Sequence, residues 1–143
     1  MDPVYMTYKV GNTLNKYGVP VLPFVIRGLM RVIFACDIPC NTSIGKGTLF
    51  PHHALGVVIN PDAVIGKNCI IRQNCTIGGR NGIMTVPVLE DNVSLGAGAM
   101  VLGPVRIGEN SEIGAGAIVI NDIPANSVAV GVPARCIKSR VCT

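Results

Sequence analysis

The chain has 143 residues, of which 49% are hydrophobic, 14% charged and 4% aromatic, and it contains no Trp. This composition excludes a disordered chain, and the length fits one domain with a short appendage. The formal net charge of +4 is scattered along the sequence. A nucleic-acid-binding surface is therefore not expected, whereas an anionic ligand is compatible with this charge.

The N-terminal arm, residues 1–35, lacks the repeat that organises the rest of the chain. Within it, residues 25–35 are predicted to form a helix with Arg27 and Arg31 on one side, at positions i and i+4. The apolar stretch is too short and too charged for a membrane span. Two interpretations remain open: a helix that caps the end of a coil, or a helix that lies on a membrane surface.

Residues 36–143 form the second predicted unit, in which an aliphatic residue recurs with a period of six. These positions are Ile44, Ile59, Ile65, Ile71, Ile77, Leu89, Leu95, Val101, Ile107, Ile113 and Val119. Glycine often follows, and the fourth residue after the aliphatic one is usually small, as at Thr48, Ala63, Cys69, Cys75, Val93, Ala99, Ser111 and Ala117.

A period of six matches neither a helix nor a simple alternating strand. It predicts a short strand followed by a corner, repeated so that stacked turns bury a continuous aliphatic column. The small residue would fit the tight interior, and the glycine would relieve the backbone at the corner. Cys69 and Cys75 occupy the small position and are therefore expected to be core residues.

The six cysteines form no CxxC pair, no signal peptide precedes them, and the chain has two histidines. We therefore expect reduced thiols in the cytoplasm and no metal site.

The hexads IGKGTL, IGKNCI, LGAGAM, IGENSE and IGAGAI resemble those of the hexapeptide-repeat transferases. The resemblance implies a mainly β fold, a left-handed parallel β-helix with three hexads per turn. It also implies a homotrimer, with acyl-CoA bound between two neighbouring helices. Whether trimers pair into hexamers stays open.

The period breaks at two places. Fifteen residues separate Ile44 from Ile59, and both histidines, His52 and His53, lie in this interval. The second break is a glycine-rich segment, residues 78–82, which is predicted to be a loop. Functional residues of a solenoid are expected at such interruptions, and histidine suits proton transfer near neutral pH. The alternative is a solvated histidine pair without a role.

The segments DIP, PHHALGVVINPDAVIGKN, QNCTIGG, LGAGAMVLGPVRIG and GVPAR are similar to those of serine acetyltransferases. They resemble even more the shorter serine-acetyltransferase-like enzymes of bacterial polysaccharide synthesis. The resemblance implies that His52 is the general base and that Asp37 orients it. Counting back from Gly56 gives His53 instead, which stays a second candidate. Asp37 has an alternative role as an exposed turn residue before Pro39.

For the cofactor, the resemblance implies acetyl-CoA laid along the coils. At the matching positions, Ala97 and Ala115 would leave room for the pantetheine arm. Asn121 would contact the cofactor near its end, and Arg135 and Lys138 would face its phosphates. Backbone N–H groups of Gly78 and Gly79 are candidate donors to the tetrahedral oxyanion. The alternative is that the alanines are small corner residues and the cations a solvated tail.

One departure bears on the acceptor. Serine acetyltransferases usually carry Arg-His-Pro at the end of the glycine loop, where this chain has Thr85-Val86-Pro87. We therefore predict an acetyl-CoA-dependent O-acetyltransferase acting on a hydroxyl of a sugar or polysaccharide precursor, with serine O-acetylation as the alternative. A non-catalytic scaffold is the alternative from another class. A metalloenzyme of the carbonic anhydrase kind would need three histidines.

The expected partners are a small-molecule acceptor with a free hydroxyl and two further copies of the chain, with no nucleic acid. If the N-terminal arm lies on a membrane, the protein would make peripheral contact with the inner membrane surface.

Overall fold

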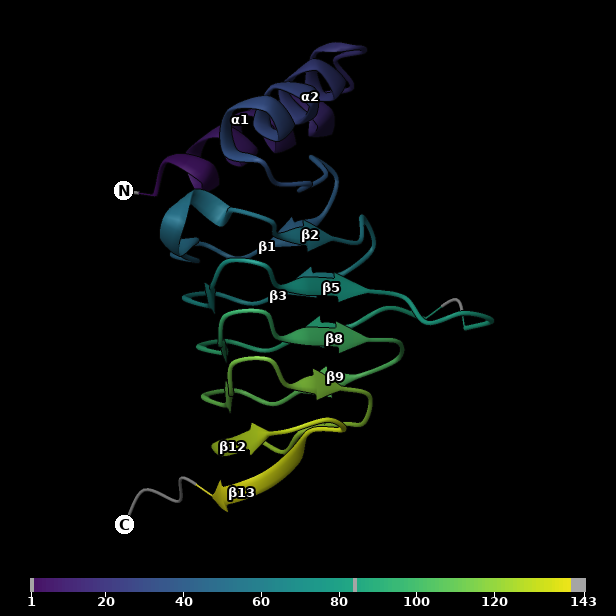
Figure 1. Ribbon diagram of the computed structural model, residues 1–143. Helices are drawn as coiled ribbons and strands as arrows, with labels where there is room; N and C mark the ends of the chain where they lie inside the picture. Colours follow the sequence, from purple (N-terminus) through teal and green to yellow (C-terminus); the bar gives the residue numbers. More distant parts are fainter. Residues whose placement is uncertain (1, 84, 140–143) are drawn as a thin grey trace.

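The computed structural model describes residues 2–83 and 85–139. Two helices, α1 (Pro3–Lys16) and α2 (Leu22–Phe34), lie together at one end of a column of stacked coils (Figure 1). The predicted helix over residues 25–35 corresponds to α2, whereas α1 was not predicted. Its start is nevertheless marked in the sequence, because Asp2 accepts a hydrogen bond from the Tyr5 N–H and Pro3 occupies the first turn.

The column is built from short strands, which are β1 (Ser43–Ile44), β2 (Val58–Ile59), β3 (Val64–Ile65), β4 (Ile70–Ile71), β5 (Thr76–Gly78), β6 (Val88–Leu89), β7 (Ser94–Leu95), β8 (Met100–Leu102), β9 (Arg106–Ile107), β10 (Glu112–Ile113), β11 (Ile118–Val119), β12 (Ser127–Val130) and β13 (Arg135–Ser139). They form three sheets, ordered β1-β3-β6-β9, β11-β8-β5-β2 and β13-β12-β10-β7-β4. Neighbouring strands in these sheets are parallel except β12 with β13.

The strand register explains the sequence period. Ser94 pairs with Glu112 and Met100 with Ile118, each eighteen residues further on, so a regular coil contains three hexads. Thr76 pairs with Met100, twenty-four residues on, because one extra hexad leaves the column as the loop between β5 and β6.

The first coil carries the other interruption. Ser43 pairs with Val64, twenty-one residues further on, and the three additional residues are taken up by the short turn η1 (Pro51–Ala54). The position of both breaks in the period is thus confirmed by the strand register.

The aliphatic column predicted from the period is confirmed. All eleven periodic aliphatic residues and all eight small residues that follow them in the repeat are buried. The Cys69 and Cys75 side chains are fully buried, and their thiols donate to the carbonyl oxygens of Glu90 (3.2 Å) and Gly96 (3.1 Å). These cysteines are core residues, as expected.

The predicted role of the glycines was wrong in part. A Cβ built on Gly96 would lie 2.4 Å from the backbone nitrogen of Ala115, and one on Gly45 would lie 2.4 Å from the carbonyl carbon of Gly66. These glycines are therefore required by the close approach of neighbouring coils. The left-handed corner residue comes two positions later, where Gly98 has φ +69°.

Helix α2 packs one side against the first coil and leaves another exposed. Pro23 and Met30 are buried. The apolar α2 face, made of Leu22, Val25, Leu29, Val32 and Ile33, is exposed, with Val32 83% accessible. The helices thus cover the end of the column, yet they present an uncovered apolar surface. Among the described residues, neither helix is long and apolar enough to cross a membrane.

Candidate active site

Both histidines lie in a strained turn. His52, His53 and Ala54 have φ values of 56°, 56° and 57°, three successive residues in the left-handed region. Non-glycine residues in this region cost free energy and cluster at functional sites. The two imidazole side chains are exposed on the surface. The turn therefore presents its histidines outward at a conformational cost that a plain corner would not require.

The turn is held from both sides. The Phe50 N–H donates to the Asp2 carboxylate (2.6 Å), and the Gly56 N–H donates to the Ala35 carbonyl (2.9 Å). The His53 ring lies 6.0 Å from the Phe34 ring, measured between centroids. The helical arm and the first coil therefore fix the turn together.

The predicted pantetheine residues lie in line with the histidine turn. Backbone hydrogen bonds stack the corners below it: Asn74 N–H to Leu55 O, Gly98 N–H to Gln73 O and Gly116 N–H to Ala97 O, each 2.8 or 2.9 Å. Ala97 and Ala115 therefore belong to this edge of the column, termed here the histidine edge. The structure brings these alanines and the histidines to one edge.

The predicted oxyanion donors lie at another corner. Gly78 ends β5 and Gly79 begins the loop that projects from the column (Figure 1). Strand β11 belongs to the same sheet as β5 and runs parallel to it, so Asn121, which follows β11, lies on the same side of the sheet as Gly78. We term this the glycine edge. Within a single chain, the histidines therefore lie on one side of this sheet and Gly78, Gly79 and Asn121 on the other, separated by the width of the sheet.

The predicted phosphate ligands are at the far end of the column. Arg135 and Lys138 lie on β13, which runs antiparallel to β12, and both are exposed. Strand β13 lies at the end of the column opposite to the helices (Figure 1). This position is compatible with a contact to an extended cofactor running down the column, and their role stays a prediction.

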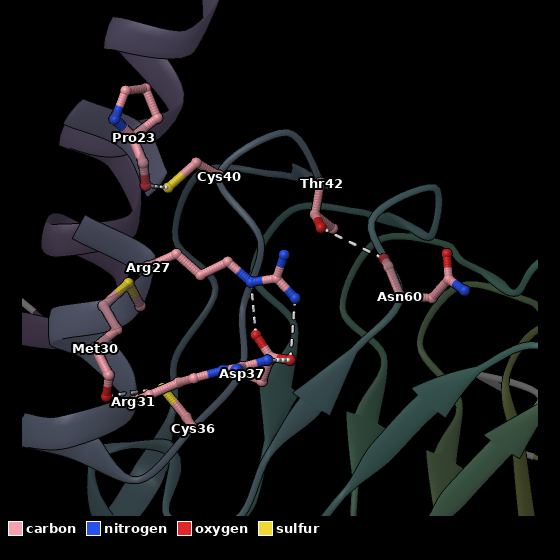
Figure 2. A network of polar contacts seen from close by, with 9 residues as sticks. All are labelled: Pro23, Arg27, Met30, Arg31, Cys36, Asp37, Cys40, Thr42 and Asn60. Carbon is pink, nitrogen blue, oxygen red and sulfur yellow. Dashed lines mark hydrogen bonds and ion pairs between the residues drawn. The ribbon is translucent and has the colours of Figure 1, made fainter. Parts of the chain in front are cut away.

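Asp37 has partners that were not predicted. The Arg27 Nε and Nη2 atoms donate to Oδ1 (2.7 Å) and Oδ2 (3.0 Å), and the Arg31 Nη2 atom also donates to Oδ2 (Figure 2). Hydrogen bonding from Arg27, together with that from Arg31, lowers the pKa of Asp37 to about 2. None of the hydrogen bonds given for the described residues joins Asp37 to His52, so its orienting role stays a prediction.

This pKa shift predicts an acid-sensitive contribution to stability. The folded-state pKa is below the ordinary aspartate value of 3.8, so the stabilisation is present above that pH and is lost as pH falls through about 2. We expect the thermal unfolding temperature of the wild type to exceed that of Asp37→Asn at pH 6, with the difference shrinking towards pH 2. An equal difference at both pH values would contradict the ion pairing.

One polar group on the histidine edge was not predicted. The Gln73 side-chain oxygen Oε1 is buried and has no hydrogen-bond partner among the described residues. Buried polar atoms without partners are uncommon in proteins. The available signal was that Gln73 is the only glutamine of the chain and occupies a corner.

The described residues contain no group of three or more metal-ligating side chains. A cavity of about 480 Å³ lies between α1 and the first coil, lined in part by Tyr5, Met6 and Leu49. None of the predicted site residues lines it. The candidate site is therefore an open surface of the single chain.

The stacked hexads, the parallel sheets and the interrupted corners define a hexapeptide-repeat β-helix protein. The family model for bacterial transferase hexapeptide (six repeats) matches residues 87–121. A serine acetyltransferase from Synechococcus elongatus is 39% identical over 91% of this chain and 54% of the relative. A serine acetyltransferase from Brucella abortus in complex with coenzyme A has a TM-score of 0.89 at 32% identity, over 97% of this chain and 56% of that one. A soybean serine acetyltransferase complexed with serine has a TM-score of 0.87 at 38% identity, over 94% of this chain and 56% of that one.

The chain is similar to serine acetyltransferases over the part of their length that it matches, and it has their hexapeptide-repeat left-handed β-helix fold. It spans about half the length of the relatives that it matches.

Proposed function

We propose that this protein is an acetyl-CoA-dependent O-acetyltransferase whose acceptor is L-serine. The observation that carries the proposal is the strained turn that presents both histidines at the edge where the corners of the coils, Ala97 and Ala115 included, stack below it. The similarity to proteins described as complexes with coenzyme A and with serine supports the donor and the acceptor.

The comparisons support serine better than the sugar hydroxyl that the sequence favoured. The sugar prediction rested on Thr85 and Val86, which replace a cationic pair of the loop. The relatives at 39%, 38% and 32% identity are all serine acetyltransferases. Sugar hydroxyls are therefore the competing acceptors against which L-serine is tested.

In the proposed mechanism, a His52 ring nitrogen accepts the proton of the serine hydroxyl. The hydroxyl oxygen then bonds to the thioester carbonyl carbon, which gives a tetrahedral intermediate. Its oxyanion accepts hydrogen bonds from the backbone N–H groups of Gly78 or Gly79, and the carbon–sulfur bond then breaks. The proton passes from the imidazolium to the departing CoA sulfur. A general base of this kind contributes about 10²–10⁴ in rate.

The proposed working unit is a trimer. Because the histidine edge and the glycine edge lie at opposite sides of one sheet, a single chain does not bring the base and the oxyanion donors together. In a cyclic trimer, the histidine edge of one subunit is placed against the glycine edge of the next, which completes three equivalent sites.

The direct test is CoA release from acetyl-CoA with L-serine, compared with a panel of sugars. The proposal expects thiol release that depends on L-serine and exceeds the background hydrolysis rate. Release with a sugar and none with serine would restore the first acceptor prediction. CoA binding without turnover on any hydroxyl would favour the scaffold alternative.

The apolar α2 face supports a further proposal, peripheral contact with an anionic membrane at its cytoplasmic face. The exposed Lys9 lies beside the exposed Val10 of α1. The one acid of the arm, Asp2, is engaged in hydrogen bonds to backbone N–H groups. An exposed apolar helix face on an arm that also carries exposed bases is typical of helices that lie in a membrane interface.

We expect the protein to cosediment with vesicles that contain phosphatidylglycerol and to do so less with phosphatidylcholine alone. Val32→Asp should abolish the cosedimentation, because it places a charge at the most exposed position of the apolar face. Equal binding of both variants, or none by the wild type, would contradict membrane contact.

A further inference from the structure

Two arginines of α2 meet a single carboxylate at the start of the β-helix. Arg27 binds Asp37 through both Nε and Nη2, and this paired geometry satisfies both carboxylate oxygens. Arg31 adds one bond from Nη2 (Figure 2). Two guanidinium cations therefore face one carboxylate, which leaves one positive charge uncompensated within this cluster.

The two arginines differ in how much of each remains available. The Arg27 side chain is 33% exposed and uses two N–H groups on Asp37, whereas the Arg31 side chain is 58% exposed and uses one. A guanidinium has five N–H donors, so most of the donors of Arg31 are free of Asp37. A hollow of about 180 Å³, lined by Phe24, Arg27, Gly28 and Arg31, opens beside them. The ion pair of Arg27 with Asp37 holds α2 against the first coil, whereas Arg31 exposes free N–H donors to solvent.

This cluster lies close to the histidine turn. Asp37 pairs with Val58 of β2, which begins four residues after Ala54, the last residue of the turn. Phe34, whose ring contacts His53, is three residues from Arg31 and so lies about one helical turn away. By contrast, Arg80 of the glycine loop lies against Gly103, at the other edge of the sheet.

We propose that Arg31, supported by Arg27, binds the carboxylate of the amino-acid acceptor and thereby selects an acceptor that carries a carboxylate. The inference deepens the proposed function and rests on it. It also accounts for how a chain with Thr85 and Val86 in its loop would hold an acceptor carboxylate: the cation comes from α2. Arg31 is thus a residue that determines specificity, and the proton transfer belongs to the histidine.

The test compares L-serine with L-serinamide, which keeps the hydroxyl and replaces the carboxylate by a neutral amide. In Arg31→Gln we expect KM for L-serine to rise about tenfold or more, since a charge-assisted hydrogen bond is lost, with kcat changed by less than about threefold. KM for L-serinamide should stay at its wild-type value. Arg31→Lys should fall between the two, because it keeps the charge and loses the planar fork.

Arg106→Gln is the matched control, because Arg106 also pairs with a carboxylate, that of Glu90 (2.6 Å), on a different sheet. It should leave both KM values unchanged. An unchanged KM for L-serine in Arg31→Gln, or an equal rise for both acceptors, would overturn the inference. The unfolding temperature of each variant separates loss of binding from loss of folding.

The failure of the proposed function has a different signature. If the wild type releases no CoA with L-serine, the acetyltransferase proposal fails, and calorimetric titration with L-serine still tests the anion site. Heat of binding that is present in the wild type and lost in Arg31→Gln would support the site, and equal heats would reject it.

Discussion

His52→Ala is expected to lower kcat for serine acetylation by about 10²–10⁴ while leaving the KM for acetyl-CoA within a few-fold of wild type. The reason is that the substitution removes the proton acceptor without changing the corners along which the cofactor is proposed to lie. Residual turnover should remain, because the proposed oxyanion donors belong to the backbone. Steady-state kinetics with both substrates varied give the two quantities separately.

His53→Ala is the matched control, since His53 shares the turn and has the same φ of 56°. His53→Ala should lower kcat far less than His52→Ala, because it removes only the contact between the His53 and Phe34 rings. If His53→Ala were inactive and His52→Ala active, the assignment of the base would pass to His53. Equal, modest losses of kcat in both variants would show that neither histidine acts as the general base.

Gly96→Val is expected to destabilise the fold by about 3 kcal/mol or more, the upper part of the range for overpacked substitutions. A Cβ at this position would lie 2.4 Å from the Ala115 nitrogen, and that neighbour is backbone of the next coil, which cannot rotate away. Chemical denaturation of the purified protein measures the change in the free energy of unfolding.

Gly28→Ala provides the contrast. Nothing lies within 4 Å of a Cβ built on Gly28, which is in α2. Alanine there should raise stability by about 0.5–1 kcal/mol, because glycine is the poorer helix residue. If Gly96→Val were as stable as wild type, the close approach of the coils would not be what requires glycine after the aliphatic residue.

The sequence predicts the column of this protein well because its spacing is dictated by local geometry. Ile71, Ile77 and Leu95 are buried as the period requires, and the interruptions at His52 and at Gly78 fall where the register adds residues. The role of Gly96 was misjudged, since the sequence shows where glycine recurs and not which neighbouring coil approaches it.

The candidate site was predicted less completely, because its contacts join elements that are not periodic. The spacing of Arg27 and Arg31 showed that they share a helix side, but the orientation of α2 over the coil is a tertiary property. Their partner, Asp37, therefore emerged from the structure. The unpartnered oxygen of Gln73 likewise depends on burial that no local pattern encodes.

The most direct test of the account is activity in mixed trimers. His52→Ala lacks the base, and Gly79→Val places a side chain in the open space at the glycine edge, where the proposed oxyanion and the neighbouring subunit would lie. If each site combines the histidine edge of one subunit with the glycine edge of the next, randomly mixed trimers of the two inactive variants should recover about a quarter of wild-type activity. No recovery, with mixing verified by mass, would show that the site is not shared between subunits and would contradict the account.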